Sequence, residues 1–308
     1  MFYYAQLAIW VGTECRHLCL LGGGIRIDEN LGLEDKKAMK LSGRMEAVAA
    51  MVSPVGILAD IGTDHGYVPV ALVERGIAGR AIAADVRPGP LSRAQQTIAR
   101  AGLGQQISTR LSDGLCAFAP GEMDAIVIAG MGGALVIRIL KDGRRVAHSA
   151  NQIVLQPQSE IAGVRRFLMQ DGYVILDEEM VCEDGKYYTV IKACDAAGIS
   201  CSLPENRAVS RMVSNPNVLN RIEEEPKAET LSDTCTIESY SEVEYAYGRI
   251  LLRKSHPVLL QYLEKEARQL QKILTGIPAD GKSPQALQRR EEILHQLELN
   301  QLAMASFC

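Results

Sequence analysis

Hydrophobic residues in the first two thirds of the chain form short apolar runs that alternate with segments of helical spacing. The apolar runs are short enough to be buried strands, and the segments between them are long enough for helices. Such alternation predicts a parallel sheet covered by helices on both faces. The predicted strands are Val55 to Ala59, Ala81 to Val86, Ile107 to Leu111, Ala125 to Ile128 and Gln152 to Leu155. The predicted helices are Tyr67 to Arg75, a segment ending at Arg100, another ending at Leu140, and Ile161 to Gln170.

The alternation of strand and helix patterns ends after the last of these helices. Tyr173 to Val181 and Tyr187 to Ala193 both have strand composition, and only five residues separate them. That gap is too short for a helical crossover, so the two strands form a hairpin that turns at Asp184 and Gly185. A parallel sheet closed by an antiparallel hairpin is typical of class I methyltransferases with a Rossmann-like fold. A nicotinamide dehydrogenase usually continues with further parallel units.

Changes in composition divide the chain into four segments. Residues 1–38 lack clear periodicity, and we interpret them as a non-native or disordered extension, with Met39 as the authentic start. Residues 39–194 hold the alternating pattern, and we expect them to form a domain of the methyltransferase type. Residues 195–244 are rich in Ser, Asn, Pro and Glu, with ten acidic and four basic residues, and we expect an acidic mobile insertion. Residues 245–308 form a helical domain.

Two amphipathic patterns near the C-terminus predict a pair of helices that fold back as a coiled-coil hairpin. A stretch rich in Gly and Pro, residues 276–284, separates them. The predicted seam consists of Leu260, Leu263, Ala267, Leu270, Leu274, Leu287, Leu294, Leu297 and Met304.

Length and composition fit one sizeable α/β domain with an appendage: 308 residues, 47% of them hydrophobic. The eight cysteines include no Cys-x-x-Cys pair, so neither a zinc site nor a disulfide framework is supported, and we expect no metal. No apolar span reaches the roughly 20 residues of a membrane helix. We therefore expect a reduced, cytoplasmic protein without a membrane partner, and a monomer. The net charge of −4 is concentrated in the insertion, so a nucleic-acid partner is compatible with the remainder.

Candidate chemistry begins in the turn after the first strand, Asp60-Ile-Gly-Thr-Asp-His-Gly-Tyr67. A strand, a tight turn and a helix N-terminus together form a ligand crevice. The turn has only Gly62 and Gly66, whereas a dinucleotide fingerprint needs Gly-x-Gly-x-x-Gly. Its carboxylates, Asp60 and Asp64, would repel a phosphate but suit a ligand with an ammonium and a sulfonium, such as S-adenosylmethionine. His65 is a candidate base, although a histidine in such a loop more often orients backbone or cofactor.

Further polar residues follow the later strands. Asp85 ends the second strand, where an acid can bind a ribose diol, or alternatively cap a helix. Asp113 and Gly114 follow the third strand, where a carboxylate could accept from an adenine amine or could simply form a turn. After the fourth strand comes Ala129-Gly-Met-Gly-Gly133, whose glycines indicate a close approach of the backbone to a ligand or to a packed helix. The Asn/Asp-Pro-Pro-aromatic tetrapeptide of many amino-methylating enzymes is absent there.

These residues carry a resemblance to a known family. The chain resembles the bacterial tRNA (adenine-N1)-methyltransferases that modify adenosine 22, over roughly residues 41–194 and 245–305. The insertion is a departure from that pattern, as is Arg249, where the family tends to have proline after Gly248. The matching motifs are Leu41-Ser-Gly-Arg44, Asp60 to Pro69, Ile128-Ala-Gly-Met-Gly-Gly133, Leu155-Gln-Pro157, Glu183-Asp-Gly-Lys-Tyr-Tyr188 and His256 to Glu266.

The resemblance implies S-adenosyl-L-methionine as methyl donor, tRNA as partner, and N1 of an adenine as acceptor. Asp64 and His65 are then the candidate catalytic residues, and Arg44 is a candidate contact to the substrate. By position, it assigns Asp60, Gly62, Asp64 and His65 to the methionine end, Asp85 to the ribose, Asp113 and Gly114 to the adenine, and Gly130, Met131 and Gly132 to the border of the acceptor base.

Three other functions remain open from the sequence. The chain could methylate a small molecule or a protein, which labelling of tRNA would exclude. It could be a nicotinamide-dependent oxidoreductase, which the missing glycine fingerprint disfavours. It could also be a nucleotide-binding interaction protein without catalysis, which turnover on RNA would exclude.

Overall fold

The computed structural model describes residues 6–11, 14–19, 39–197, 239–277 and 283–307. Contacts divide the chain into two units at the boundary between Ala38 and Met39. The first unit contains two antiparallel strands, β1 (Gln6–Val11) and β2 (Glu14–Cys19). Most of the predicted insertion, 198–238, lies outside the described residues. The division into four segments and the start at Met39 therefore stay predictions.

The second unit is built on a seven-stranded sheet with strand order β5-β4-β3-β6-β7-β9-β8. The first five strands in this order pair in parallel, and β9 pairs antiparallel with both β7 and β8. This arrangement confirms the predicted Rossmann-like sheet and its terminal hairpin. The strands are β3 (Val55–Ile61), β4 (Ala78–Asp85), β5 (Ile107–Leu111), β6 (Ala125–Met131), β7 (Gln152–Pro157), β8 (Tyr173–Glu183) and β9 (Lys186–Asp195).

Among the described residues, six helices form the two hydrophobic cores on the faces of the sheet. The alternation of side chains along each strand explains this division. In β3, Ala59 and Ile61 belong to one hydrophobic core, whereas Leu58 belongs to the core on the other face. The first core contains α4, α5 and α6, and the second contains α1, α2 and α3. The helices are α1 (Gly43–Met51), α2 (Tyr67–Glu74), α3 (Pro88–Ala101), α4 (Gly133–Asp142), α5 (Arg144–Ser149) and α6 (Ile161–Gln170).

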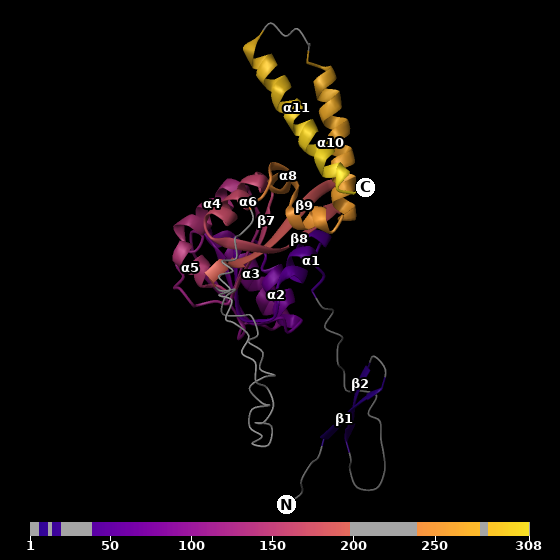
Figure 1. Cartoon of the computed structure of the whole chain (residues 1–308). Coiled ribbons are helices and arrows are strands. Elements are labelled where there is room, and N and C mark those ends of the chain that lie inside the picture. The colour runs from indigo at the N-terminus through magenta and orange to yellow at the C-terminus, as the bar shows by residue number, and fades with distance from the viewer. Residues whose placement is uncertain (1–5, 12–13, 20–38, 198–238, 278–282, 308) are drawn as a thin grey trace, which may run out of the picture. The chain divides into compact units, whose positions relative to one another are not determined.

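The chain then continues through α8 (Glu242–Tyr247), α9 (Arg249–Arg253), α10 (Pro257–Thr275) and α11 (Pro284–Ala305). The start of α8 lies inside the predicted insertion, because Ser241 and Glu244 cap the helix reciprocally and extend order toward the N-terminus. In Figure 1, α10 and α11 lie side by side and extend away from the sheet.

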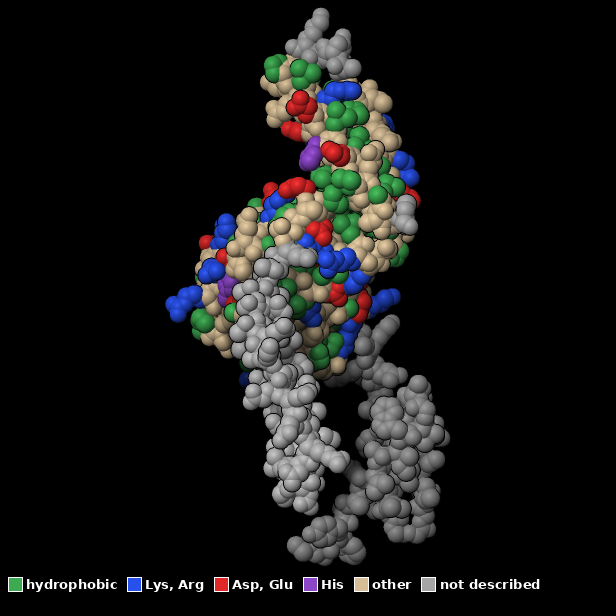
Figure 2. Space-filling model, in the orientation of Figure 1, with side chains coloured by type: hydrophobic (Ala, Val, Ile, Leu, Met, Phe, Trp, Pro, Cys, Tyr) green, Lys and Arg blue, Asp and Glu red, His purple; other side chains and the backbone are tan. Residues whose placement is uncertain are grey.

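The seam between α10 and α11 was only partly predicted. Leu263, Leu270 and Leu297 are buried as expected, but Leu287 and Leu294 are exposed. Ile293 is fully buried in place of Leu294, and the next buried positions on α11 are Leu297, Asn300 and Ala303. The polar Asn300 interrupts the apolar pattern of α11, so the sequence did not indicate which face of this helix is buried. Hydrophobic side chains also appear on the outer surface of these helices in Figure 2. The coiled-coil geometry itself stays a prediction.

A buried ion pair attaches α8 and α9 to the sheet. Arg165 on α6 and Glu178 on β8 are 1% and 0% exposed, and Arg165 Nε donates to Glu178 Oε1 at 2.7 Å. Arg165 Nη1 also donates to the carbonyl oxygens of Tyr245 and Ala246, each at 2.9 Å. Glu178 Oε2 accepts from the backbone N–H of Ile250 at 3.2 Å. The pair therefore connects α6, β8, α8 and α9. Its two charges are compensated only when these elements pack in this arrangement.

In the part of the chain that the structure describes, no helix is long and apolar enough to cross a membrane.

Candidate active site

A pocket of about 360 Å³ opens where β3 and β6 end, at the carboxyl edge of the parallel strands. This edge is where open α/β sheets bind ligands, at the point where the strand order reverses. Strand β3 lies between β4 and β6, so the reversal falls beside it. The lining residues are Lys40, Leu41, Ser42, Arg44, Met45, Asp60, Gly62 to Val68, and Ala129.

The turn after β3 has the tight conformation that its glycines indicated. Gly62 has φ +80°, a left-handed conformation that side chains rarely adopt. The backbone N–H groups of Gly62 and Thr63 both donate to the carbonyl of Ala84, at 2.8 and 2.9 Å, which anchors the turn to β4. The helix α2 then begins at Tyr67. The turn thus forms one wall of the pocket, and hydrogen bonds to the neighbouring strand β4 hold it in place.

Asp60 is the buried charge of the pocket. It is 7% exposed, and burial raises its pKa to about 6, with the carboxylate of Asp85 adding to the shift. The nearby Thr63 hydroxyl opposes the shift, although it makes no hydrogen bond of normal geometry. A cation that enters the pocket would stabilise the ionised form of this buried carboxylate, because its charge offsets the cost of desolvation.

The Thr63 hydroxyl is buried, 3% exposed as a residue, and has no hydrogen-bond partner in the described structure. Buried polar atoms are normally satisfied, so an unsatisfied one in a pocket wall indicates a ligand or water partner. Together with the buried carboxylate of Asp60, this hydroxyl fits a ligand that carries an ammonium group. Sequence reasoning missed Thr63, and its position between two candidate aspartates was the available signal.

Asp64 and His65 lie farther out. The Asp64 side chain is 63% exposed and pairs with Arg93 on α3, and this hydrogen bond lowers its pKa. His65 Nε2 lies 3.4 Å from Asp64 Oδ2, and its ring stacks on Tyr67 with centroids 5.1 Å apart. Both residues line the pocket, so the structure brings them to the predicted place. Their catalytic role stays a prediction.

Asp85 and Asp113 follow the next two strands outward from the pocket. Asp85 is 8% exposed at the end of β4, and its Oδ1 accepts from the backbone N–H of Arg87 at 2.8 Å. Asp113 is exposed and pairs with Arg138 at 3.2 Å. Gly114 follows it with φ +54° and lies against Ile139. These three residues follow strands of the same sheet edge but do not line the pocket, so their predicted contacts to the donor stay predictions.

The glycine segment after β6 lies beside the pocket. The register shifts between Ala129 and Met131 as β6 pairs with β7, so the backbone bulges at Gly130. Gly132 caps α4, and Gly133 packs so closely on Ser159 that a Cβ would lie 2.4 Å from its carbonyl oxygen. Close packing thus accounts for Gly133, whereas Gly130 and Gly132 remain candidate ligand neighbours.

Arg44 reaches this segment from the start of α1. A Cβ at Gly130 would lie 3.8 Å from Arg44 Nη1. The guanidinium also lies 5.1 Å from the ring centre of Tyr188 and donates to Gln156 Oε1 at 3.4 Å. Gln156 is fully buried, and the same oxygen accepts from the backbone N–H of Gly130 at 3.2 Å. Gln156 was missed as a site residue, although a glutamine that ends an apolar strand was a visible signal.

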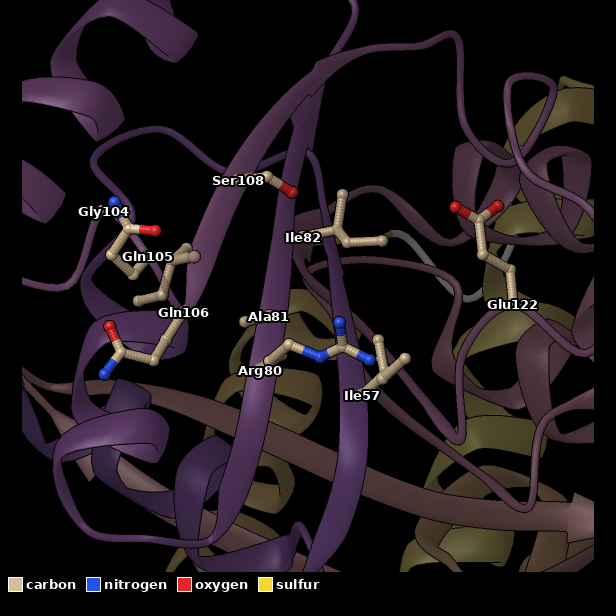
Figure 3. A pocket seen from close by; sticks show the side chains of 10 residues that line it. Ile57, Arg80, Ala81, Ile82, Gly104, Gln105, Gln106, Ser108 and Glu122 are labelled. Carbon is tan, nitrogen blue, oxygen red and sulfur yellow. The ribbon is translucent and has the colours of Figure 1, made fainter.

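A second pocket, of about 310 Å³, lies at the amino ends of β3, β4 and β5 (Figure 3). Ile57, Arg80 and Ser108 line it from the three strands. This is the opposite edge of the sheet from Asp60, and none of the predicted site residues reaches it. The pocket at the carboxyl edge is therefore the candidate active site.

Comparison with known proteins identifies the domain that carries this site. A family model described as a methyltransferase domain matches residues 41–191, which include every candidate site residue. This stretch, just under half of the chain, is therefore similar to a methyltransferase domain. The tRNA (adenine(22)-N(1))-methyltransferase of Bacillus subtilis is 39% identical over 155 residues. That alignment covers 50% of this chain and 65% of the relative, so the chain matches somewhat less than two thirds of the relative's length.

Solved structures of related methyltransferases extend the likeness to the C-terminal helices. The Bacillus subtilis m1A22 tRNA methyltransferase TrmK has a TM-score of 0.67 at 28% identity, covering 86% of this chain and 99% of that protein. A Streptococcus pneumoniae protein solved in complex with S-adenosyl-L-methionine has a TM-score of 0.66 at 27% identity, covering 86% and 100%. These matches confirm the family resemblance predicted from the sequence.

Proposed function

We propose that this methyltransferase transfers a methyl group from S-adenosyl-L-methionine to N1 of an adenine in tRNA, at position 22. The observation that carries the donor assignment is the pocket at the end of β3, where the buried Asp60 and the unsatisfied hydroxyl of Thr63 face a cavity of about 360 Å³. The names of the relatives support the acceptor. We also propose that the enzyme is cytoplasmic and acts as a monomer.

S-adenosyl-L-methionine supplies, when bound, a methyl group on an already cationic sulfur. Asp60, Thr63 and Asp64 would hold its methionine end, Asp85 its ribose, and Asp113 with Gly114 its adenine. The chain needs no phosphate-binding loop for this ligand. The carboxylates of the turn supply the charge that an ammonium and a sulfonium require.

On the acceptor side, the site must position the adenine and does not need to transfer a proton. Adenine N1 has a lone pair in the plane of the ring, so it needs no base to remove a proton first. Holding two reactants in line can contribute ~7 to 11 kcal/mol to lowering a barrier. Gly130, Met131 and Gly132 would border the base, and Arg44 is held beside Gly130 by Gln156 and Tyr188. His65 is then assigned to orienting the donor or the turn.

The methylated adenine carries a positive charge that develops during transfer. A carboxylate near the base stabilises such charge, and Asp64 is the exposed carboxylate of the pocket. Its pairing with Arg93 keeps it ionised, because that hydrogen bond lowers its pKa.

Incubation of the protein with unmodified tRNA and donor, followed by nucleoside mass spectrometry, tests the proposal. We expect N1-methyladenosine, and we expect none when adenosine 22 of the tRNA is replaced by guanosine. N6-methyladenosine would contradict the acceptor atom. Donor binding without turnover on tRNA would contradict the proposal and favour a small-molecule or protein substrate, or a non-catalytic role.

A further inference from the structure

A third pocket, of about 410 Å³, lies between the β8–β9 turn and α10. Its lining combines the side chains of Tyr187, Tyr188 and Tyr262 with those of Lys186 and Lys265. All three tyrosines are half-buried, so parts of their rings remain open to a ligand. Aromatic rings beside ammonium groups form the combination that single-stranded nucleic acid binds, through base stacking and phosphate contacts.

Two of the three aromatic side chains of this pocket, Tyr187 and Tyr262, are held by contacts within the protein. The rings of Tyr187 and Tyr262 meet edge to face, with centroids 5.3 Å apart and an interplanar angle of 68°. Lys265 Nζ lies 5.1 Å from the ring centre of Tyr187 and donates to the carbonyl of Gly185 at 2.8 Å. The hairpin turn and α10 therefore hold each other, and the rings lose little freedom when a base packs on them.

The only carboxylate among the lining residues is occupied by protein donors. Glu266 accepts from the hydroxyls of Tyr247 and Tyr262, each at 2.7 Å, and from the amide of Asn300 at 3.0 Å. The Glu266 carboxylate thus points into the interface between α10 and α11, and its hydrogen bond orients the side chain of Tyr262. The two lysines remain the charges that face an incoming ligand, which favours a polyanion.

This pocket lies close to the acceptor end of the active site, because two of its lining residues contact residues there. The backbone N–H of Gln158, which lines the pocket, donates to the carbonyl of Met131 at 2.8 Å. The ring of Tyr188 also contacts Arg44, which lines the donor pocket. Gln158 and Tyr188 therefore line this pocket and contact residues beside the active site. This adjacency favours a polymeric ligand that extends from the acceptor position to the third pocket.

We propose that the pocket between the β8–β9 turn and α10 binds a nucleotide of the RNA next to the target adenine, with its base on the tyrosines and its phosphate at Lys186 and Lys265. This inference rests on the proposed function, since it takes tRNA as the substrate. A base taken out of its stack in a folded RNA loses stacking energy of a few kcal/mol. Stacking of its neighbour on the protein compensates part of that cost.

The test compares Tyr187→Leu with Tyr187→Phe and with the control Arg80→Gln, whose side chain lies at the opposite edge of the sheet. Tyr187→Leu should weaken tRNA binding about 10-fold, because it removes the stacking ring but keeps an apolar side chain. Tyr187→Phe, which keeps the ring, should stay within about twofold of the wild type. The Kd for S-adenosyl-L-methionine should not change in any variant, which excludes unfolding as the cause.

Two further measurements identify the contact. Ultraviolet cross-linking of the wild-type complex, followed by mass spectrometry, should place Tyr187 or Tyr262 on a nucleotide next to the methylated one. Lys265→Gln should reduce the salt dependence of tRNA binding by about one unit in the slope of log Kd against log salt. A Tyr187→Leu variant that binds tRNA as tightly as Arg80→Gln, in an enzyme that methylates tRNA, would overturn this inference alone. A wild type that neither binds nor methylates tRNA would overturn the proposed function together with it.

Discussion

The side chain of Met131 occupies the space above Gly62. A Cβ at position 62 would lie 1.9 Å from Met131 Cε, and the Gly62 backbone has φ +80°. The turn after β3 and the segment after β6 are therefore packed directly on each other, without room for a single methyl group. The proposed donor contacts and the proposed acceptor contacts share this point of contact.

Gly62→Ala should lower donor affinity at least about 10-fold, since the methyl group must displace Met131 or distort the turn, a loss of about 1.4 kcal/mol in binding. The measurement is the Kd of S-adenosyl-L-methionine by calorimetry. Gly76→Ala is the matched control, because it has φ +68° but nothing within 4 Å of the added Cβ. The control should lose about 1–2 kcal/mol of stability from backbone strain alone and keep its donor affinity. If Met131 causes the loss, Met131→Ala combined with Gly62→Ala should recover donor binding.

Asp60→Asn should stabilise the fold while weakening donor binding. The pKa of Asp60 is raised to about 6 in the folded state, so its contribution to stability is fully present below its unfolded value near 4 and is lost as the pH rises through 6. Above pH 6 the buried charge costs about 2–3 kcal/mol that the asparagine variant avoids. Urea unfolding of both proteins from pH 4 to pH 8 measures the difference, which should grow with pH and then level off.

The same titration should appear in donor binding. A protonated Asp60 cannot pair with an ammonium group, so the affinity of the wild type should fall as the pH drops below about 6. The asparagine variant should bind weakly at every pH in this range. An asparagine variant with wild-type affinity at pH 7 would show that Asp60 does not contact the donor.

Asp64→Asn should reduce kcat more than donor affinity, by roughly 10-fold in kcat, if the carboxylate stabilises the charge that develops on the base. Arg93→Gln separates this role from a structural one, because it removes the partner of Asp64 but keeps the carboxylate. Rapid-quench kinetics with tRNA and equilibrium donor binding supply the two readouts. Equal losses of kcat and donor affinity in Asp64→Asn would assign the residue to donor binding.

Arg165→Met should destabilise the protein by about 3–5 kcal/mol, because it leaves Glu178 charged and uncompensated in the interior. Arg166→Met is the control on the next residue of α6. Arg166 pairs with Glu242, and both side chains are at least 38% exposed, so its loss should cost no more than about 1 kcal/mol. Denaturant unfolding measures both. Similar losses in the two variants would mean that the buried pair does not anchor α8 and α9.

Arg268 and Lys272 lie four residues apart on α10, and both are exposed. If the helical hairpin grips the tRNA backbone, replacing both with glutamine should weaken tRNA binding and reduce the salt slope by about two. Donor affinity should stay the same, because neither residue lines the donor pocket. A salt slope equal to that of the wild type would place the RNA elsewhere.

The sequence predicted those features that repeat locally along the chain. The strands of the sheet show as apolar runs, and the β8–β9 turn shows as Asp184-Gly185, whose φ values of 50° and 71° are those of the expected hairpin turn. The candidate residues after β3, β4 and β6 were predicted because parallel strands bring their carboxyl ends to one edge. Positions relative to a strand end therefore carried most of the information.

Features that depend on contacts between distant residues could not be predicted. Arg165 and Glu178 are 13 residues apart and read as ordinary surface charges, because nothing local shows that they are buried together. Asn300 reads as a break in an apolar seam, yet its amide donates to the carbonyl of Leu263 across the helix pair. The third pocket joins Gln158, Tyr187 and Tyr262, whose proximity only the packing of α10 on the hairpin creates.

The ion pair of Arg165 and Glu178 also holds α8 and α9 in one position on the sheet. A partial rotation of α8 and α9 would leave two charges buried without partners, so we expect these two helices to keep their positions on the sheet when a substrate binds. For the tRNA substrate proposed above, we therefore expect a constant separation between the donor pocket and the helical hairpin. An RNA that offers the right nucleotide at a different distance from the backbone that the hairpin would bind should then be a poor substrate.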